Sequence, residues 1–196
     1  MTTWLTDEEL MLRYRNGDAA AFDTLYRRYE RPLFDFIHRL VPNSADTESL
    51  FQETFLRLVR AKDGYRATAQ FKTWLLQIAV NLCRDRARRM KHRSHLSLST
   101  PLSAAGAGHG EVQDLVADPS LPVDRSIEVS ELEAVVKGAV GSLPEDERLV
   151  VVLKEYQGMT YPEIAGVMDR PVGTLKFLHH RACERLRAAL TPYLGE

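Results

Sequence analysis

Residues 160–182, TYPEIAGVMDRPVGTLKFLHHRA, decide the fold of the C-terminal half of this chain. Thr160 and Glu163 form a capping box at the start of a short helical pattern, and Asp169-Arg170-Pro171 interrupts that pattern. A longer helical pattern then runs from Val172 to Leu190. A short helix, a tight turn and a longer helix are the outline of a helix-turn-helix. An ordinary αα-hairpin has the same outline and stays open as the alternative at this point.

The last helix of this motif has one apolar and one polar face when its residues are laid on a helical wheel. Leu175, Leu178 and Ala182 fall on the apolar face, which we expect to pack against the shorter helix. Ala165 supplies the small residue that a close helix crossing requires, and Asp169 tolerates the left-handed backbone of the turn. The polar face near the start of the helix carries the candidates for contact with a DNA major groove: Thr174, Lys176, Phe177, His180 and Arg181.

Helical spacing of apolar residues recurs through the rest of the chain. It predicts helices over residues 6–17, 18–40, 46–62 and 70–93, and then over 123–140 and 144–157. No alternation typical of strands interrupts this pattern, so the sequence predicts an all-α protein. Residues 97–110 are rich in Ser, Gly and Ala, the composition of a flexible tether. We therefore predict two small helical domains, 1–95 and 127–196, joined by a flexible linker over 96–126.

Charge is segregated along the chain although it nearly cancels in total. The 26 Lys and Arg residues and 27 Asp and Glu residues give a formal net charge of -1. Residues 54–93 hold 11 basic and 2 acidic residues, a net +9, whereas residues 96–147 hold 2 basic and 10 acidic residues, a net -8. The basic segment ends in the dense run RDRARRMKHR at residues 84–93. A solvated charged face is the ordinary explanation of such a run, but this density favours a polyanionic partner.

Composition and motifs argue against several other classes of protein. An apolar content of 44% supports a folded core, and the lack of a long apolar run or a signal-peptide pattern predicts a cytoplasmic protein without stable membrane insertion. Cys83 and Cys183 are too few for a disulfide framework and are predicted to be buried thiols. We expect no catalytic residue, no metal and no cofactor, because no metal-ligand spacing, nucleophile motif or phosphate-binding loop is present.

Blocks of sequence in both halves resemble one known family. Residues 143–153, 158–165, 171–176 and 180–187 are similar to the C-terminal promoter-binding domain of the extracytoplasmic-function (ECF) sigma factors of bacterial RNA polymerase. Residues 22–29, 48–55 and 71–89 are similar to the N-terminal domain of the same family. The blocks occur in the family's order and cover nearly the whole chain outside the linker.

The resemblance implies a non-enzymatic subunit that binds core RNA polymerase, recognises a promoter and helps to open it. Its implied contacts with the clamp helices of the polymerase are Glu48, Leu50, Gln52, Glu53 and Phe55. Its implied contacts with the -10 element are Arg60, Tyr65, Arg66, Lys72, Asn81, Arg84, Arg88 and Arg89, a cationic and aromatic set suited to unstacked bases. The last helix would read the -35 element through the five candidates named above, and an anti-sigma factor is an expected partner.

Some positions depart from the family's pattern. Ser49 stands where the clamp-binding pattern usually carries an acid. Phe177 and Leu178 stand where Ser and Arg are common, and His179 occupies an apolar core position. Elsewhere, aromatic residues at helical spacing are more often core than base platforms, so Phe71 and Trp74 are expected mainly in the core.

Two other functions remain as alternatives. One is a stand-alone helix-turn-helix regulator that binds duplex DNA, with residues 1–95 as a sensor or dimerisation domain. The other is an enzyme, which the motifs support least. The basic segment and the clamp-binding pattern of the first half distinguish the sigma factor from the regulator, because a regulator needs neither.

Overall fold

The structure is a computed structural model that describes the backbone of residues 5–41, 43–67, 70–97 and 123–193. Side chains are described for the same residues except 91–97 and 123–130. Most of the predicted linker, residues 98–122, lies outside this description.

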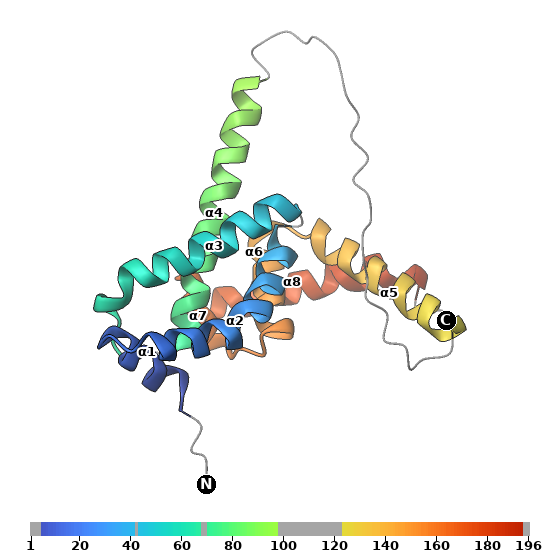
Figure 1. The fold of residues 1–196 in the computed structure, drawn as a ribbon. Coiled ribbons are helices and arrows are strands. Elements are labelled where there is room, and N and C mark those ends of the chain that lie inside the picture. Colours follow the sequence, from blue (N-terminus) through green and yellow to red (C-terminus); the bar gives the residue numbers. More distant parts are fainter. Residues whose placement is uncertain (1–4, 42, 68–69, 98–122, 194–196) are drawn as a thin grey trace.

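All regular elements of the described residues are helical, which confirms the predicted all-α class (Figure 1). In chain order they are α1 (Asp7–Arg15), α2 (Ala19–Leu40), α3 (Ser44–Ala61), η1 (Lys62–Gly64), α4 (Phe71–Ser97), α5 (Val123–Ser142), α6 (Glu145–Val151), η2 (Val152–Tyr156), α7 (Tyr161–Met168), α8 (Val172–Leu190) and η3 (Thr191–Tyr193). Helices α1 to α4 form the N-terminal domain, and α5 to α8 form the C-terminal domain.

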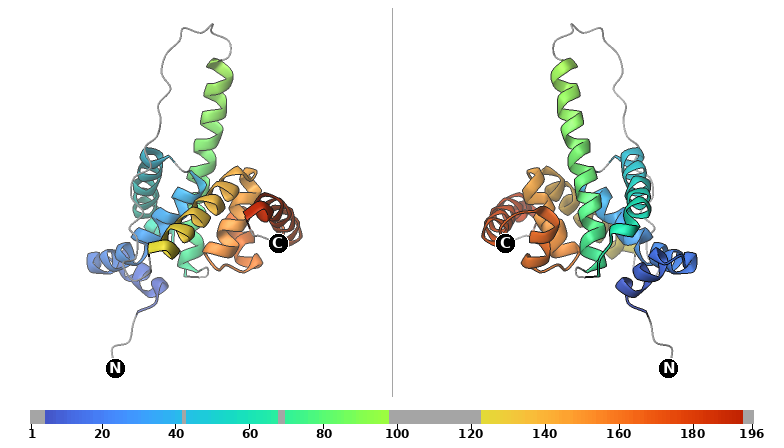
Figure 2. Two further views of the ribbon diagram at one scale, coloured as in Figure 1. Left: turned by 90° about the vertical axis from the view of Figure 1, so that its right-hand side faces the viewer. Right: turned by 90° about the vertical axis from the view of Figure 1, so that its left-hand side faces the viewer.

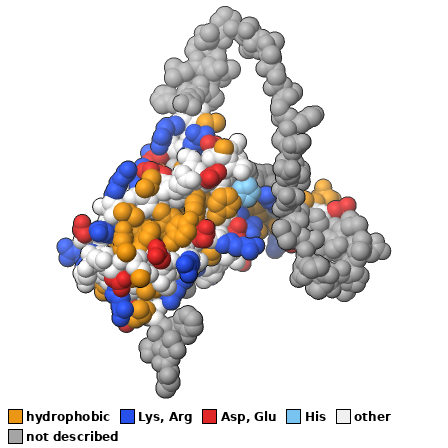
Figure 3. All heavy atoms as spheres, viewed as in Figure 1, with side chains coloured by type: hydrophobic (Ala, Val, Ile, Leu, Met, Phe, Trp, Pro, Cys, Tyr) orange, Lys and Arg blue, Asp and Glu red, His pale blue; other side chains and the backbone are white. Residues whose placement is uncertain are grey.

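The N-terminal domain is built around apolar side chains of α1 to α4. Its largest fully buried side chains are Met11, Leu25, Leu33, Phe36, Ile37, Leu58, Phe71 and Leu75. A seam of aromatic rings joins α2 to α3, where Phe22 and Tyr26 lie 6.2 and 4.8 Å from the ring centroid of Phe55. Figure 3 shows hydrophobic side chains gathered on the face over α2 and α3. Such tilted and edge-to-face pairs stabilise the packing beyond the area they bury.

Contacts from α1 fix both its own start and the start of α4. Thr6 and Glu9 form the predicted capping box at the beginning of α1. The carboxylate of Glu8 accepts the backbone N–H of Phe71 at 2.8 Å. This bond satisfies an N–H that the first turn of α4 would otherwise leave without a partner.

The C-terminal domain contains the predicted helix-turn-helix in α7 and α8. Thr160 and Glu163 form the capping box at the start of α7. Asp169 adopts the left-handed conformation, with φ 53° and ψ 52°, between the two helices. Leu175 and Ala182 are fully buried on the inner face of α8, as the helical wheel predicts.

The two domains pack against each other through α4 and, in addition, through α2. Figure 2 shows α4 between the N-terminal helices on one side and α6 to α8 on the other. Buried side chains of both domains form one continuous apolar cluster that includes Val80 of α4 and Ile164 of α7. Beyond this contact α4 extends away from the body toward Ser97 (Figure 1).

Several helix limits differ by a few residues from the predicted ones, among them those of α3 and α4. Helix α3 begins at Ser44 rather than at Asp46, because the side chain of Asn43 accepts the N–H of Asp46 at 3.0 Å and caps the helix earlier. Helix α4 continues to Ser97, four residues beyond the predicted end at Arg93. Neither difference moves a candidate site residue out of its helix.

The single helix predicted over residues 144–157 is instead two segments, α6 and the π-helical η2. The N–H of Gln157 donates to the carbonyl of Val152 at 3.1 Å, which closes the wider turn. The turn keeps Val152 and Leu153 fully buried, and Gly158 then redirects the chain with a φ of 66°. Apolar spacing alone does not distinguish this segment from a regular helix.

The two cysteines differ in burial. Cys83 is buried, as predicted, whereas the prediction for Cys183 is wrong because its side chain is only half-buried. Cys183 lies at the edge of the inner face of α8, beside buried Ala182 and exposed Glu184.

The contact between α2 and α5 contains a histidine that is held neutral. The Nε2 atom of His38 lies 3.2 Å from the ammonium of Lys137, and burial together with that charge lowers the pKa of His38 from its ordinary value of 6.5. Arg39 adds to this lowering, and Asp35 opposes it. A neutral ring accepts the hydrogen bond of Lys137, whereas a protonated ring would repel it.

We expect His38 to reduce stability under acid conditions. Because its pKa is lower in the folded protein, its contribution is complete above about pH 6.5 and is lost as the pH falls through the lowered value. His38→Gln removes this titration, so its free energy of unfolding should fall less than that of the wild type between pH 7.5 and pH 5. Chemical denaturation at both pH values measures the difference, and an equal fall in both proteins would contradict the assignment.

Candidate nucleic-acid and protein interfaces

The outer face of α8 gathers the five residues predicted to enter a DNA groove: Thr174, Lys176, Phe177, His180 and Arg181, all exposed. The side chain of Phe177 is 58% exposed, the second-largest exposure among the exposed large apolar side chains of the described residues. The guanidinium of Arg181 lies 5.7 Å from the ring centroid of Phe177. The face is therefore cationic, with one apolar ring among its charges.

A buried carboxylate holds two arginines of this helix. Glu147 of α6 has a side chain that is 4% exposed, and its oxygens lie 3.6 Å from Nε of Arg181 and 3.0 Å from Nε of Arg185. Both ion pairs are made through Nε of the guanidinium. Sequence reasoning missed Glu147 and Arg185, because their contact joins positions far apart in the chain.

The residues of α8 that depart from the family's pattern fit the fold without leaving a ring nitrogen of His179 unpaired. The Tyr161 hydroxyl lies within hydrogen-bond distance of Nδ1 of His179, at 3.0 Å. The other ring nitrogen, Nε2, lies 3.1 Å from a carboxylate oxygen of Glu155. Leu178 is half-buried and packs against the apolar core. Of the three departures in this helix, Phe177 alone faces outward.

A hollow of about 280 Å³ lies between α3 and α4. It is lined by Arg57, Arg60 and Ala61 from α3 and by Trp74, Ile78 and Asn81 from α4. The prediction that Phe71 and Trp74 belong to the core holds for Phe71, which is fully buried, whereas Trp74 is half-buried and forms a wall of the hollow. An aromatic wall with cationic and amide groups around it suits an unstacked base.

Tyr65 packs against Trp74, which forms one wall of this hollow. Its side chain is 3% exposed, and its ring centroid lies 5.0 Å from that of Trp74. Burial raises the pKa of Tyr65 to about 12. In this conformation Tyr65 is a core residue, contrary to its expected place on a DNA-binding surface.

The remaining candidates for the -10 element fall into two groups. Arg60, Arg66, Asn81, Arg88 and Arg89 are exposed. Lys72 and Arg84 are instead bound to the C-terminal domain. Lys72 donates to the carbonyl of Gln157 at 2.7 Å, and Arg84 pairs with Asp146 at 3.1 Å.

The outer face of α3 carries part of the predicted polymerase-binding set. Glu48 and Gln52 are exposed and Glu53 is half-buried on this face, with Ser49 beside them. Leu50 and Phe55 point into the core, being 8% and 6% exposed. Leu56, which the sequence did not single out, is 49% exposed among the polar residues.

Within the described residues, no cluster of His, Cys, Asp and Glu side chains is arranged to hold a metal ion. None of the helices described combines the length and apolar character that crossing a membrane requires.

Comparison with known proteins matches two segments of the chain to two families. Residues 25–93 match the family Sigma-70 region 2, and residues 135–186 match the family Sigma-70, region 4. The RNA polymerase sigma-H factor of Pseudomonas aeruginosa is 33% identical over 196 residues, covering all of both chains. The ECF RNA polymerase sigma-E factor of Escherichia coli K12 is 33% identical over 194 residues, covering 99% of each.

Solved structures share the fold at lower identity. CnrH, in complex with the cytosolic domain of CnrY, has a TM-score of 0.67 and 23% identity, covering 95% of this chain and 98% of CnrH. The sigma factor RpoE of Bartonella quintana, in complex with the anti-sigma factor NepR, has a TM-score of 0.66 and 20% identity, covering 87% of this chain and 96% of its own.

The chain belongs to the ECF sigma factors, the subunits that direct promoter-specific initiation of transcription. The match of residues 25–93 to Sigma-70 region 2 contradicts the alternative of a stand-alone regulator with an N-terminal sensor domain. Members of the family act as non-enzymatic initiation factors, which leaves the enzyme hypothesis without support.

The pairing of Glu147 predicts a measurable loss of stability when its charge is removed. Glu147→Gln should lower the free energy of unfolding by about 1–2 kcal/mol, because the ion pairs with two arginines are lost while both arginines, about half exposed, stay solvated. Glu184→Gln, which changes an exposed acid on α8, serves as a matched control and should stay within about 0.5 kcal/mol of the wild type. Equal stabilities of the two variants in urea titrations would show that the Glu147 pairs contribute nothing.

Proposed function

We propose that this sigma factor uses three separate surfaces for its three contacts in initiation. The outer face of α3 binds core RNA polymerase, the hollow between α3 and α4 with the basic side of α4 binds the -10 element, and the outer face of α8 binds the -35 element. The domain limits that go with this proposal are 1–95 and 127–196. The hollow between α3 and α4 is the observation that supports this proposal most strongly.

The hollow suits a base that has left the duplex. Trp74 offers an aromatic wall for stacking, and the amide of Asn81 offers one donor pair and one acceptor to a base edge. Arg57 and Arg60 lie on the opposite wall, where they can bind the backbone of the strand that carries the base. Arg66, Arg88 and Arg89 extend the exposed positive charge beyond the hollow.

The outer face of α8 suits duplex DNA. Lys176 and Arg181 are the residue types that bind guanine edges or phosphates, and Phe177 offers apolar contact to a thymine methyl group. Pro171 precedes α8 and no side chain caps its first turn, so the free N–H groups there can donate to a phosphate. Glu147 orients Arg181 and Arg185 through its ion pairs with them.

The outer face of α3 suits a protein partner. Glu48, Gln52 and Glu53 surround the exposed side chain of Leu56, and an apolar centre with a polar rim is the usual anatomy of an interface. Leu50 and Phe55 contribute by holding α3 in place rather than by touching the polymerase. We assign this face to the clamp helices of the largest subunit.

Further partners and the compartment follow from the same assignment. We propose that an anti-sigma factor regulates the protein, since the similar solved structures are those of CnrH with the cytosolic domain of CnrY and of RpoE with the anti-sigma factor NepR. We also propose that it acts in the cytoplasm, catalyses no reaction itself and needs no cofactor.

Two variants separate the polymerase contact from the DNA contact. Trp74→Ala should leave affinity for core polymerase unchanged and reduce promoter opening about tenfold, because loss of one stacking platform costs about 1–3 kcal/mol. Leu56→Asp should do the reverse. It should weaken core binding about tenfold, by placing a charge in the centre of an interface, while opening recovers as the core concentration is raised.

Both variants are measured with matched core enzyme on a promoter mapped by transcript sequencing. Core affinity is read by fluorescence anisotropy, and opening is read by permanganate footprinting. If the wild type gives no promoter-dependent transcript, the function itself is wrong. If Trp74→Ala opens the promoter as well as the wild type, the hollow is not the base-binding site.

A further inference from the structure

Phe177 lies at the centre of the outer face of α8. At 3.6 residues per turn it falls about 200° around the helix axis from Leu175, whose side chain is fully buried. Phe177 is 58% exposed, although an apolar side chain gains free energy when it is removed from water. The guanidinium of Arg181 lies 5.7 Å from the centroid of its ring. The ring is therefore presented to a partner and not to the protein's own core.

Neighbouring helices hold a cation on each side of this ring. On one side Arg181 lies 3.6 Å from the buried carboxylate of Glu147, which belongs to α6. On the other side the ammonium of Lys176 lies 5.8 Å from the ring centroid of Tyr161, at the start of α7. Both cations remain exposed and can bind phosphates. An apolar ring between two positive charges suits DNA better than protein, because the centre of a protein interface is usually depleted in charge.

The start of α8 allows a close approach to Phe177. Gly173 lies one turn earlier on nearly the same line of the helix, and a Cβ added there would have open space around it. Glu184 lies on this line too, but it is about 10 Å further along the axis and pairs with His180 at 3.6 Å. A duplex that meets the start of α8 thus reaches the ring away from this acid.

A phenyl ring has one favourable target among the base edges of the major groove. Thymine carries a methyl group there, whereas cytosine and the purines present hydrogen-bond donors and acceptors. A ring that covers a donor or acceptor leaves it without a partner, which costs free energy. A ring that covers a methyl group removes apolar surface from water. Phe177 should therefore select thymine, and it should do so through the methyl group.

We propose that Phe177 determines the sequence preference of this sigma factor at one base pair of the -35 element, where it requires a thymine whose methyl group it covers. Lys176 and Arg181 bind the duplex on either side, and Glu147 keeps Arg181 beside the ring. Ser, which is common at this position in the family, makes no such selection because a hydroxyl can donate or accept. This inference rests on the proposed -35 role of α8.

Selection of DNA sequences by the holoenzyme tests the preference. The full chain is assembled with matched core polymerase and offered duplexes that carry a mapped -10 element and a randomised -35 region. The wild type should select a thymine that Phe177→Ala no longer selects, while the preferences at other positions persist. Tyr193→Ala is the matched control, because Tyr193 is 61% exposed and lies beyond α8. It should select the same sequences as the wild type.

Replacement of single thymines by deoxyuridine isolates the methyl group. Deoxyuridine pairs with adenine and keeps the donors and acceptors of thymine, so the methyl group is all that is removed. In the wild type, this change at the selected thymine should weaken binding about fourfold, the effect of one buried group of methylene size. Phe177→Ala should bind both duplexes equally. Phe177→Leu keeps an apolar side chain and should retain part of the difference.

The outcomes separate the role of Phe177 from the function on which it depends. If the wild-type holoenzyme selects no sequence in the -35 region, the proposed role of α8 is wrong. If it selects a sequence but deoxyuridine has no effect at any thymine, or the same effect in Phe177→Ala, the ring does not read a methyl group. Unchanged selection by Phe177→Ala would also overturn the inference and would leave the ring to a protein partner.

Discussion

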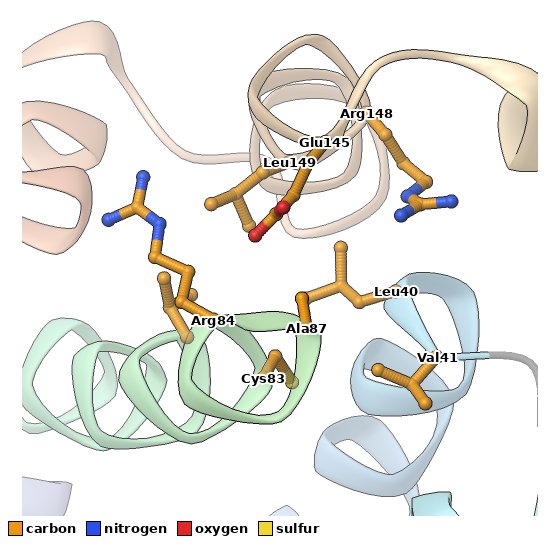
Figure 4. Close-up of a pocket in the computed structure, with 9 residues that line it drawn as sticks. Leu40, Val41, Cys83, Arg84, Ala87, Glu145, Arg148 and Leu149 are labelled. Atoms are coloured by element: carbon orange, nitrogen blue, oxygen red, sulfur yellow. The ribbon is translucent and has the colours of Figure 1, made fainter. Parts of the chain in front are cut away.

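The burial of two separate stripes of α4 is the constraint on which the rest of the structure depends. On one side Phe71 packs against Tyr29 and Tyr65 of the N-terminal domain, with ring centroids 5.3 and 6.1 Å apart. On another side Val80 and Cys83 face Leu149 of the C-terminal domain (Figure 4). A helix buried on two sides fixes the hollow beside Trp74 and brings α7 and α8 to one position.

The acidic residues that bring the net charge close to zero lie beside basic residues in the folded protein. Acidic side chains of the same chain pair with basic residues of the proposed DNA surfaces: Asp146 with Arg84, Glu53 with Arg60, and Glu147 with Arg181. Each pair orients or covers a cation in the absence of DNA. The segregated charge of the sequence therefore becomes, in the folded protein, a set of basic groups with acids close by.

Local signals in the sequence predicted much of this structure, because they act over a few residues. The capping boxes at Thr6 and Thr160, the left-handed turn at Asp169 and the inner face of α8 all depend on neighbours in the chain. The burial of Leu50 and Phe55 also follows from the helical spacing of apolar residues in α3, although the resemblance places the same two residues among the contacts with the polymerase.

Contacts between distant segments could not be predicted. Nothing near Lys72 or Arg84 in the sequence points to Gln157 or Asp146, so both cations were expected on a DNA surface. The half-buried position of Trp74 depends in the same way on how α3 packs against α4. These long-range contacts determine which of the predicted residues are exposed and which are bound to other parts of the chain.

The distance between the two domains tests the central claim, that two domains which pack together in the free protein bind separate elements of one promoter. Dyes at Asp23→Cys on α2 and Arg187→Cys on α8, both exposed positions, report this distance by single-molecule fluorescence transfer in a protein without other cysteines. High transfer is expected in the free protein, and low transfer is expected in the complex with core polymerase and promoter. The same transfer in both states would contradict this claim.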